Sequence, residues 1–165
     1  VGMLKGLAAT ALQQAYDERV RLNPGARTLV RTMAANDARC ALVSGGFTFF
    51  TSRVAEAAGF HVNRANTLIE ADGRLTGEVG DPILGKEAKL AALEELTAEL
   101  GVPPSAALAV GDGANDLAMI QAAGLGVAYR AKPIVAAQAH AKVDHADLTA
   151  LLYFQGYAEA AFVSD

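Results

Sequence analysis

The sequence predicts an α/β domain in which helices flank a parallel β-sheet. Short apolar runs, such as residues 39–43 and 107–110, alternate with helical patterns of about ten residues, and this alternation is typical of the class. Hydrophobic residues make up 52% of the 165-residue chain, which is enough for the core of one domain of ordinary size. Neither an internal repeat nor a low-complexity linker divides the sequence.

The first elements are two helices, a strand and a third helix. Apolar positions at helical spacing predict a helix over residues 7–20. Asn23-Pro24 predicts the start of a second helix, because asparagine caps helices and proline suits their first position. A short apolar run predicts a strand over 39–43 that ends at a glycine-rich turn. The next helix, over 47–58, should end at Gly59, since glycine commonly follows a helix C-terminus.

A hairpin and a long helix come next. Residues 66–71 and 74–79 flank Asp72-Gly73, a dipeptide that favours the tight turn between two antiparallel strands. An amphipathic pattern then predicts a helix over 86–100, which should end at Gly101.

The last third of the chain continues the alternation of strands and helices. A buried strand over 107–110 runs into the loop 111–113, and a helix follows over 114–122. Residues 124–128 predict another strand, and two short helix–strand units then end near Leu152. We therefore expect parallel strands whose carboxyl ends lie at one edge of the sheet, where open α/β sheets bind ligands.

Composition and charge argue against several classes of protein. The net charge of -4, with 19% charged residues, is typical of a cytoplasmic protein and argues against nucleic-acid binding, which needs a concentrated basic surface. No run of about 18 apolar residues exists, so we expect no membrane span, and the N-terminus does not resemble a secretory signal. Cys40 is the only cysteine and is interpreted as a buried core residue, and the histidines show no metal-ligand spacing. Oligomeric state is left unpredicted.

The strongest chemical signal is the loop after the strand 107–110. Asp112 lies between two glycines at the carboxyl end of that strand, and the glycines allow a sharp turn and the close approach of a ligand. Asp116 lies one helical turn later, beside Asn115, and two carboxylates with an amide suit a hard cation such as Mg²⁺. On these residues alone, a Gly-Asp turn with Asp116 as an electrostatic helix cap explains the pattern equally well.

Two weaker signals are a Ser-Gly-Gly turn and a pair of lysines. The hydroxyl of Ser44 and the amides near Gly45 and Gly46 lie between a strand and a helix N-terminus, a position suited to phosphate oxygens. Lys86 or Lys89 would neutralise a phosphoryl group as a point charge. Taken separately, such a turn is more often structural, and a lysine is more often a surface residue.

Taken in order, the three segments resemble motifs two, three and four of the haloacid-dehalogenase superfamily, and more closely the phosphoserine phosphatases. The resemblance runs almost from Val1 to about Leu152. The segments that carry it are Leu4-Lys5-Gly6-Leu7, Arg19-Val20, Pro24-Gly25, Ala41-Leu42-Val43-Ser44-Gly45-Gly46-Phe47, Ala65-Asn66, Gly73-Arg74-Leu75-Thr76-Gly77, Val110-Gly111-Asp112-Gly113-Ala114-Asn115-Asp116 and Ala131-Lys132-Pro133. It implies the superfamily's Rossmannoid parallel sheet with flanking helices.

The resemblance also implies a reaction and a set of site residues. The reaction is the Mg²⁺-dependent hydrolysis of O-phospho-L-serine, the last step of serine biosynthesis, through an aspartyl-phosphate. Lys89, rather than Lys86, falls at the position of the family's lysine. The implied residues are Ser44, Gly45, Lys89 and Asn115 for the phosphate or substrate, with Ser44 and Lys89 catalytic, Asp112 for the metal, and Asp116 for support of the metal site.

One part of the family pattern is absent from the sequence. The Asp-x-Asp-x-Thr motif, which carries the family's nucleophile at the end of the first strand, does not occur. The resemblance implies that residues 1–22 are the C-terminal part of a helical cap, 23–152 the catalytic core without its first strand, and 153–165 a tail. We expect the nucleophile upstream of Val1. We also expect the chain alone to be inactive and unstable, because loss of a central strand leaves two strand edges unpaired.

Two other functions stay open. A phosphatase for another small phosphomonoester fits as well, since the family's specificity residues would mostly lie upstream. If the chain is complete, a non-catalytic protein that binds phosphate or a metal explains the missing motif. Hard oxygen ligands accommodate Mn²⁺ or Ca²⁺ in place of Mg²⁺.

Overall fold

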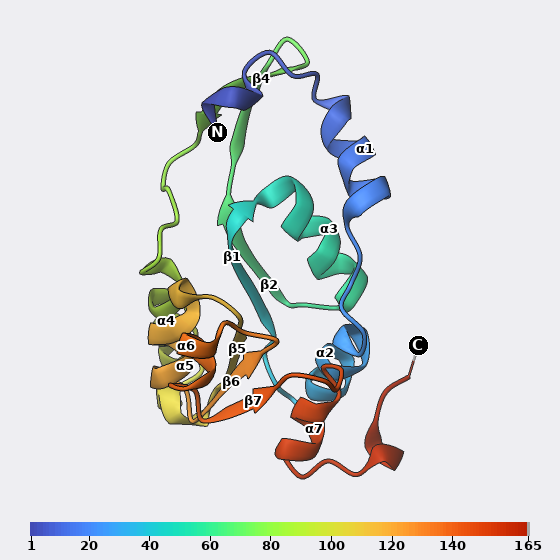
Figure 1. Cartoon of the computed structure of the whole chain (residues 1–165), viewed down its shortest axis with the longest axis vertical. Helices are drawn as coiled ribbons and strands as arrows, with labels where there is room; N and C mark the ends of the chain where they lie inside the picture. Colours follow the sequence, from blue (N-terminus) through green and yellow to red (C-terminus); the bar gives the residue numbers. More distant parts are fainter. Residues whose placement is uncertain (165) are drawn as a thin grey trace. The chain divides into compact units, whose positions relative to one another are not determined.

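The computed structural model describes residues 1–164, which fold into two compact units (Figure 1). The first unit contains Val1–Leu84 together with residues 163–164, and the second contains Gly85–Phe162. Both units combine helices with parallel strands, which confirms the expected α/β class. The expected boundaries after residues 22 and 152 stay predictions.

The first unit is built on a parallel pair of strands and an antiparallel hairpin. Its elements are η1 (Gly2–Leu4), α1 (Thr10–Arg19), α2 (Ala26–Ala35), β1 (Ala41–Phe47), α3 (Thr48–Ala58), β2 (Val62–Asn66), β3 (Leu68–Ala71) and β4 (Arg74–Val79). β1 and β2 pair in parallel with α3 as the connecting helix, and β3 pairs with β4. Val30, Cys40 and Ala58 form a buried core cluster, so the expected burial of the cysteine is confirmed.

Two local predictions for this unit are confirmed, each by a backbone conformation. Asp72 and Gly73 have φ values of 51° and 72°, the left-handed conformation that the tight hairpin turn requires. α3 ends at Gly59, whose φ of 95° strains any residue with a side chain. The backbone conformation at the hairpin turn therefore favours Asp72-Gly73, and the conformation at the end of α3 favours Gly59.

The first helix begins later than its periodicity predicts. The N–H of Leu75 donates to the carbonyl of Leu7 over 2.9 Å, and Ala8 forms an antiparallel bridge with Arg74. The carbonyl of Leu7 pairs with the hairpin and is not free to accept a helical hydrogen bond, and α1 starts only at Thr10. The predicted start at residue 7 is wrong because a contact distant in sequence overrides the local pattern.

Two further predictions in this unit are wrong, and one strand was not predicted. The strand predicted to end at residue 43 continues, because an irregularity over residues 44–46 leads to a further pairing of Phe47 with Asn66. Asn23 does not cap α2, whose cap residue is Gly25 with a φ of 77°. β2 was not predicted, because apolar and polar residues do not alternate in its sequence, Val-Asn-Arg-Ala-Asn.

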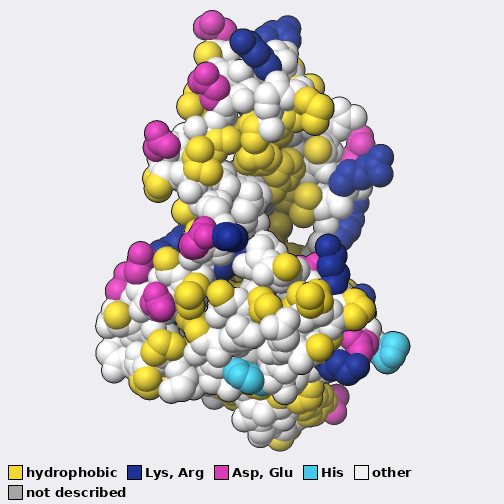
Figure 2. Space-filling view, turned by 60° about the vertical axis from the view of Figure 1, so that its left-hand side comes forward, with side chains coloured by type: hydrophobic (Ala, Val, Ile, Leu, Met, Phe, Trp, Pro, Cys, Tyr) yellow, Lys and Arg dark blue, Asp and Glu magenta, His cyan; other side chains and the backbone are white. Residues whose placement is uncertain are grey.

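Large hydrophobic side chains are exposed near the N-terminus and the hairpin of the first unit. They are Val1, Met3, Leu7 and Ile69, with Met3 99% exposed. Figure 2 shows hydrophobic side chains, in yellow, gathered in the upper part of the view, where Figure 1 shows α1 and β4.

The second unit is a three-stranded parallel sheet with helices beside it. Its elements are α4 (Ala88–Glu99), η2 (Pro104–Ala106), β5 (Leu108–Gly111), η3 (Ala114–Asp116), α5 (Leu117–Ala122), β6 (Leu125–Tyr129), α6 (Pro133–Ala136), β7 (Ala141–Val143), α7 (Ala150–Phe154) and η4 (Glu159–Ala161). The strands lie in the order β5-β6-β7, and Figure 1 shows α4, α5 and α6 grouped beside β5 and β6. Ile120, Ala128 and Val135 form its buried core cluster.

Most elements of the second unit match their predicted ranges to within one or two residues. The exception follows β7, where α7 forms but no further strand occurs in the part of the chain that the structure describes, so the second predicted helix–strand unit is wrong. Among residues 1–164, no helix has the length and apolar character that crossing a bilayer requires.

Candidate functional site

The loop after β5 is organised around the buried carboxylate of Asp116. The side chain of Asp116 is only 3% exposed. Its Oδ2 accepts hydrogen bonds from the backbone N–H groups of Asp112 and Gly113, each over 3.0 Å. Two amide donors satisfy one oxygen of a buried carboxylate, as burial of a charged group demands. Asp116 therefore fixes the conformation of the loop that carries Asp112.

The glycines of this loop make room for the side chains that follow them. A Cβ at Gly111 would lie 2.4 Å from the Cβ and Cγ of Asp116, and a Cβ at Gly113 would lie 2.5 Å from Oδ1 of Asn115. Neither separation is possible between carbon or oxygen atoms that are not bonded. Gly111 is thus required by close packing against the fixed carboxylate of Asp116, whereas at Gly113 the clash is with the free end of the Asn115 side chain. The carboxylate of Asp116 also caps η3 by accepting the N–H of Gly113, as the interpretation of the segment as a capped Gly-Asp turn expects.

Lys89 on α4 forms an ion pair with the second oxygen of Asp116. Its ammonium contacts Oδ1, and the lysine side chain is 15% exposed. Lys86, by contrast, lies on the surface and pairs only with its neighbour Glu87, over 3.6 Å, with both side chains 78% exposed. A partly buried lysine is held by its carboxylate partner, whereas an exposed pair contributes little. The geometry therefore agrees with Lys89, rather than Lys86, as the lysine of the site.

Asp112 and Asn115 present exposed side chains from the same loop. The backbone N–H of Lys132 donates to the carbonyl oxygen of Asp112 over 3.2 Å, so the backbone is held while the carboxylate stays accessible. Among residues 1–164, no group of three or more acidic, histidine or cysteine side chains forms a complete metal site. One accessible carboxylate nevertheless fits Mg²⁺, which binds through one or two carboxylates, waters and substrate phosphate.

The Ser44-Gly45-Gly46 turn lies in the first unit, inside the irregular part of β1. The N–H of Gly46 donates to Oγ of Ser44 over 3.0 Å, which orients the hydroxyl and leaves its hydrogen for another acceptor. A Cβ added at Gly45 would meet no atom within 4 Å, and its φ is not in the left-handed region. Neither packing nor conformation requires glycine at this position, but a ligand that approaches the backbone would.

Asn66 contacts this turn and was not identified as a site residue from the sequence. Its side-chain Nδ2 donates to the carbonyl oxygen of Gly45 over 3.0 Å, although the two residues are 21 positions apart. Ala65-Asn66 does carry part of the family resemblance, which is the only signal in the sequence that singles it out. A contact of such separation requires the pairing of β1 with β2, and β2 was not predicted.

The structure thus assembles the predicted residues in two groups. Lys89, Asp112, Asn115 and Asp116 come together in the second unit, and Ser44 and Gly45 form a turn in the first. Chemically, the first group offers a cation, an exposed carboxylate and an amide, and the second a hydroxyl with backbone donors. Such groups suit the binding and transfer of a phosphoryl group.

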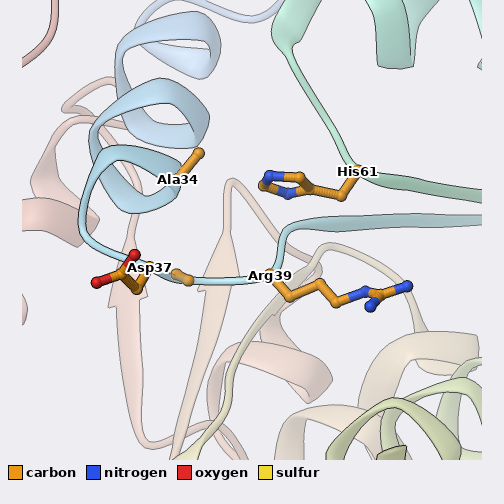
Figure 3. Close-up of a pocket in the computed structure, with 5 residues that line it drawn as sticks. Ala34, Asp37, Arg39 and His61 are labelled. Atoms are coloured by element: carbon orange, nitrogen blue, oxygen red, sulfur yellow. The ribbon is translucent and has the colours of Figure 1, made fainter. Parts of the chain in front are cut away.

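A surface depression of the first unit contains none of these residues (Figure 3). It is lined by Ala34, Asp37, Ala38, Arg39 and His61, which precede the N-terminal ends of β1 and β2. Parallel sheets bind their ligands at the opposite, carboxyl ends of the strands. The ring of His61 is engaged locally, since its Nδ1 accepts the N–H of Cys40 over 3.0 Å. We therefore assign no catalytic role to this depression.

Comparison with known proteins gives consistent matches. Residues 1–121 match the family model described as haloacid dehalogenase-like hydrolase. The phosphoserine phosphatase of Streptomyces coelicolor is 46% identical over 156 residues, which cover 94% of this chain and 38% of that protein. The phosphoserine phosphatase of Polaromonas sp. is 44% identical, over 92% of this chain and 66% of that protein.

Solved structures show the same similarity in three dimensions. A phospho-aspartyl intermediate analogue of phosphoserine phosphatase has a TM-score of 0.86 at 34% identity and covers 93% of this chain and 73% of its own. The chain spans between 38% and 66% of the length of the two curated relatives, so it corresponds to part of each of them.

Proposed function

Because this chain belongs to the haloacid dehalogenase-like hydrolases and, within them, to the phosphoserine phosphatases, we propose that it acts as part of an enzyme that hydrolyses O-phospho-L-serine. The products are L-serine and phosphate, and the reaction is the last step of serine biosynthesis, in the cytoplasm. The observation that carries the proposal is the buried pair of Lys89 and Asp116 beside the exposed carboxylate of Asp112. Burial of a lysine and an aspartate is costly, and here the buried pair holds both an ammonium and the loop of Asp112 in fixed positions, as a phosphoryl-transfer site requires.

The proposal assigns phosphate binding to the turn in the first unit. The hydroxyl of Ser44 donates its free hydrogen to a phosphate oxygen, and the backbone amides near Gly45 bind another. The open space at Gly45 admits the phosphate close to the main chain. These donors are oriented before the substrate binds, so little reorganisation is needed during the reaction.

The proposal assigns charge neutralisation to the lysine of the second unit. The ammonium of Lys89 faces the negative charge of the transferring phosphoryl group, and the ion pair with Asp116 holds that ammonium in place. Asn115 donates from its amide to the phosphate or the substrate. Each residue acts through an interaction that strengthens as negative charge develops on the phosphoryl oxygens.

Asp112 is the residue of this chain that would hold Mg²⁺, and Asp116 would support the site through the backbone amides of the same loop. When bound, the cation neutralises phosphate charge and orients the transferring group. Magnesium is favoured over softer metals because the available donor is a carboxylate oxygen.

The proposed reaction needs a carboxylate nucleophile that the 165 residues do not supply in the family's motif. A carboxylate oxygen bonds to phosphorus while the bond from phosphorus to the serine oxygen breaks, and the serine oxygen takes up a proton. A water oxygen then bonds to phosphorus and releases a proton, which replaces the one that serine took up. The bond from phosphorus to the carboxylate oxygen breaks, so phosphate leaves and the carboxylate is restored. A related structure holds an analogue of such a phospho-aspartyl intermediate, which supports this two-step route.

Two features of the structure support a contribution from residues outside this sequence. Among residues 1–164, β1 pairs with β2 alone and β5 with β6 alone, so each has an edge available to a further strand. The exposed side chains of Val1, Met3 and Leu7 form apolar surface that additional residues would cover. We propose that an upstream segment supplies the nucleophile and the rest of a helical cap.

The test compares the polypeptide of the complete reading frame with the 165-residue chain. Phosphate release from phosphoserine is measured with Mg²⁺ and with EDTA. We expect Mg²⁺-dependent release from the complete polypeptide and none from the chain alone. Faster release from another small phosphomonoester in the same assay would assign a different substrate, and no release from any of them would leave a non-catalytic binding protein as the function.

A further inference from the structure

Asn66 is a buried amide whose hydrogen-bonding groups bind the main chain of two separate segments. It ends β2 and is 6% exposed. Its Nδ2 donates to the carbonyl oxygens of Gly45 and Leu84, over 3.0 Å and 3.3 Å, and its Oδ1 accepts the N–H of Leu84 over 2.7 Å. Burial of a primary amide is costly unless it is hydrogen-bonded, and here both ends of the amide are satisfied.

The contact with Gly45 falls where the strand ladder is irregular. β1 pairs regularly with β2 through Val43, and the pairing resumes only at Phe47. Between these positions Gly45 is exposed and has no side chain to pack. The amide of Asn66 fixes the carbonyl of Gly45 from the neighbouring strand, and this fixes the orientation of the adjoining peptide groups, because each peptide unit is planar.

The contact with Leu84 anchors the segment that leads to α4. Leu84 lies five positions before Lys89 in the sequence, and both its N–H and its carbonyl group bind the one amide. The side chain of Asn66 thus binds the main chain of both Gly45, in the turn proposed to bind phosphate, and Leu84. A mere packing residue would need neither the donor nor the acceptor.

We infer that Asn66 is a positioning residue for phosphoryl transfer, and that it acts by holding the Ser44-Gly45 turn in the conformation that binds the phosphate. The inference rests on the proposed function, because it takes this turn as the phosphate site. Asn66 itself touches neither the phosphate nor the reacting atoms. Its effect reaches the reaction through the main chain of Gly45.

The test uses two substitutions of Asn66 and one matched control in the complete polypeptide. Asn66→Ala removes all of these hydrogen bonds. Asn66→Asp keeps the shape and the acceptor for Leu84 N–H but cannot donate to Gly45 when ionised. Asn63→Ala is the control, because Asn63 lies on the same strand and its amide donates over 3.0 Å to Ser52, away from the turn.

For each variant, kcat and KM for phosphoserine and the melting temperature are measured. We expect kcat to fall about tenfold to a hundredfold in both Asn66 variants, the scale that displacement of a binding group produces, with a smaller change in KM. Asn63→Ala should keep the kcat of the unmodified enzyme. Hydrogen exchange should show the Leu84 amide still protected in Asn66→Asp and exposed in Asn66→Ala.

A second measurement needs no variant and covers the case in which the variants do not fold. Inorganic phosphate is titrated into the unmodified ¹⁵N-labelled polypeptide, and we expect the Gly45 amide and the Asn66 side-chain amide to shift with one midpoint, while that of Asn63 stays unchanged. The inference is overturned if Asn66→Asp retains full kcat, or if Gly45 shifts and Asn66 does not. An unmodified enzyme that fails to hydrolyse phosphoserine refutes the proposed function, whereas loss of activity confined to the Asn66 variants does not.

Discussion

Replacing Asp116 with alanine removes its hydrogen bonds and its ion pair from the loop after β5. The backbone N–H groups of Asp112 and Gly113 lose the acceptor that lies 3.0 Å from each, and Lys89 loses its partner. The side chains of Lys89 and Asp116 are 15% and 3% exposed, so water replaces little of what is lost. Removal of one member of a buried ion pair costs about 3–5 kcal/mol, and hydrogen bonds to charged groups about 1.5–3 kcal/mol each. Because these contributions overlap, we expect a loss of about 4 kcal/mol.

The free energy of unfolding is measured by urea titration of the complete polypeptide, followed by far-ultraviolet circular dichroism. A loss of about 4 kcal/mol corresponds to a roughly thousandfold lower ratio of folded to unfolded protein. The control is Asp144→Ala, which breaks a 3.1 Å pair with Lys142 in the same unit, where the side chains are 39% and 63% exposed. That surface pair should contribute less than about 1 kcal/mol. If both variants lose the same small amount, the carboxylate of Asp116 does not organise the loop, and the reasoning is refuted.

Three further predictions concern the tail, the cysteine and the isolated chain. Thr32→Val should lower the free energy of unfolding, measured by urea titration, by about 1–3 kcal/mol, because the hydroxyl of fully buried Thr32 accepts the N–H of Val163 over 2.9 Å. Thr32→Ser keeps a hydroxyl at this position and should therefore retain most of that free energy. Burial raises the pKa of the Cys40 thiol, so its alkylation should be slow until denaturant is added, and equal alkylation rates in native and denatured protein would contradict the burial. The contribution of this thiol to the free energy of unfolding is fully present below the ordinary thiol pKa of about 8.5 and is lost as pH rises through the raised pKa. The 165-residue chain alone should show no single cooperative melt by circular dichroism, since β1 and β5 each have an unpaired edge among residues 1–164, and a sharp transition would count against this.

The sequence predicted the features that depend on neighbouring residues. The hairpin turn at Asp72-Gly73 and the end of α3 at Gly59 follow from φ values that few residues adopt. The apolar strand before Asp112 and the glycines around it follow from local pattern, and the order of the motifs identified the family before any contact was known.

Contacts between distant residues decided the rest. Ala8 leaves the helical pattern to pair with Arg74, and Asn66 reaches Gly45 only because β2 pairs with β1. The family resemblance favours Lys89 over Lys86, but only the folded chain gives Lys89 its partly buried pair with Asp116 and leaves Lys86 on the surface. The physical reason is that local sequence determines which backbone conformations have low free energy. Burial determines which polar groups need a hydrogen-bond or ion-pair partner, and that partner is fixed only when the chain has folded.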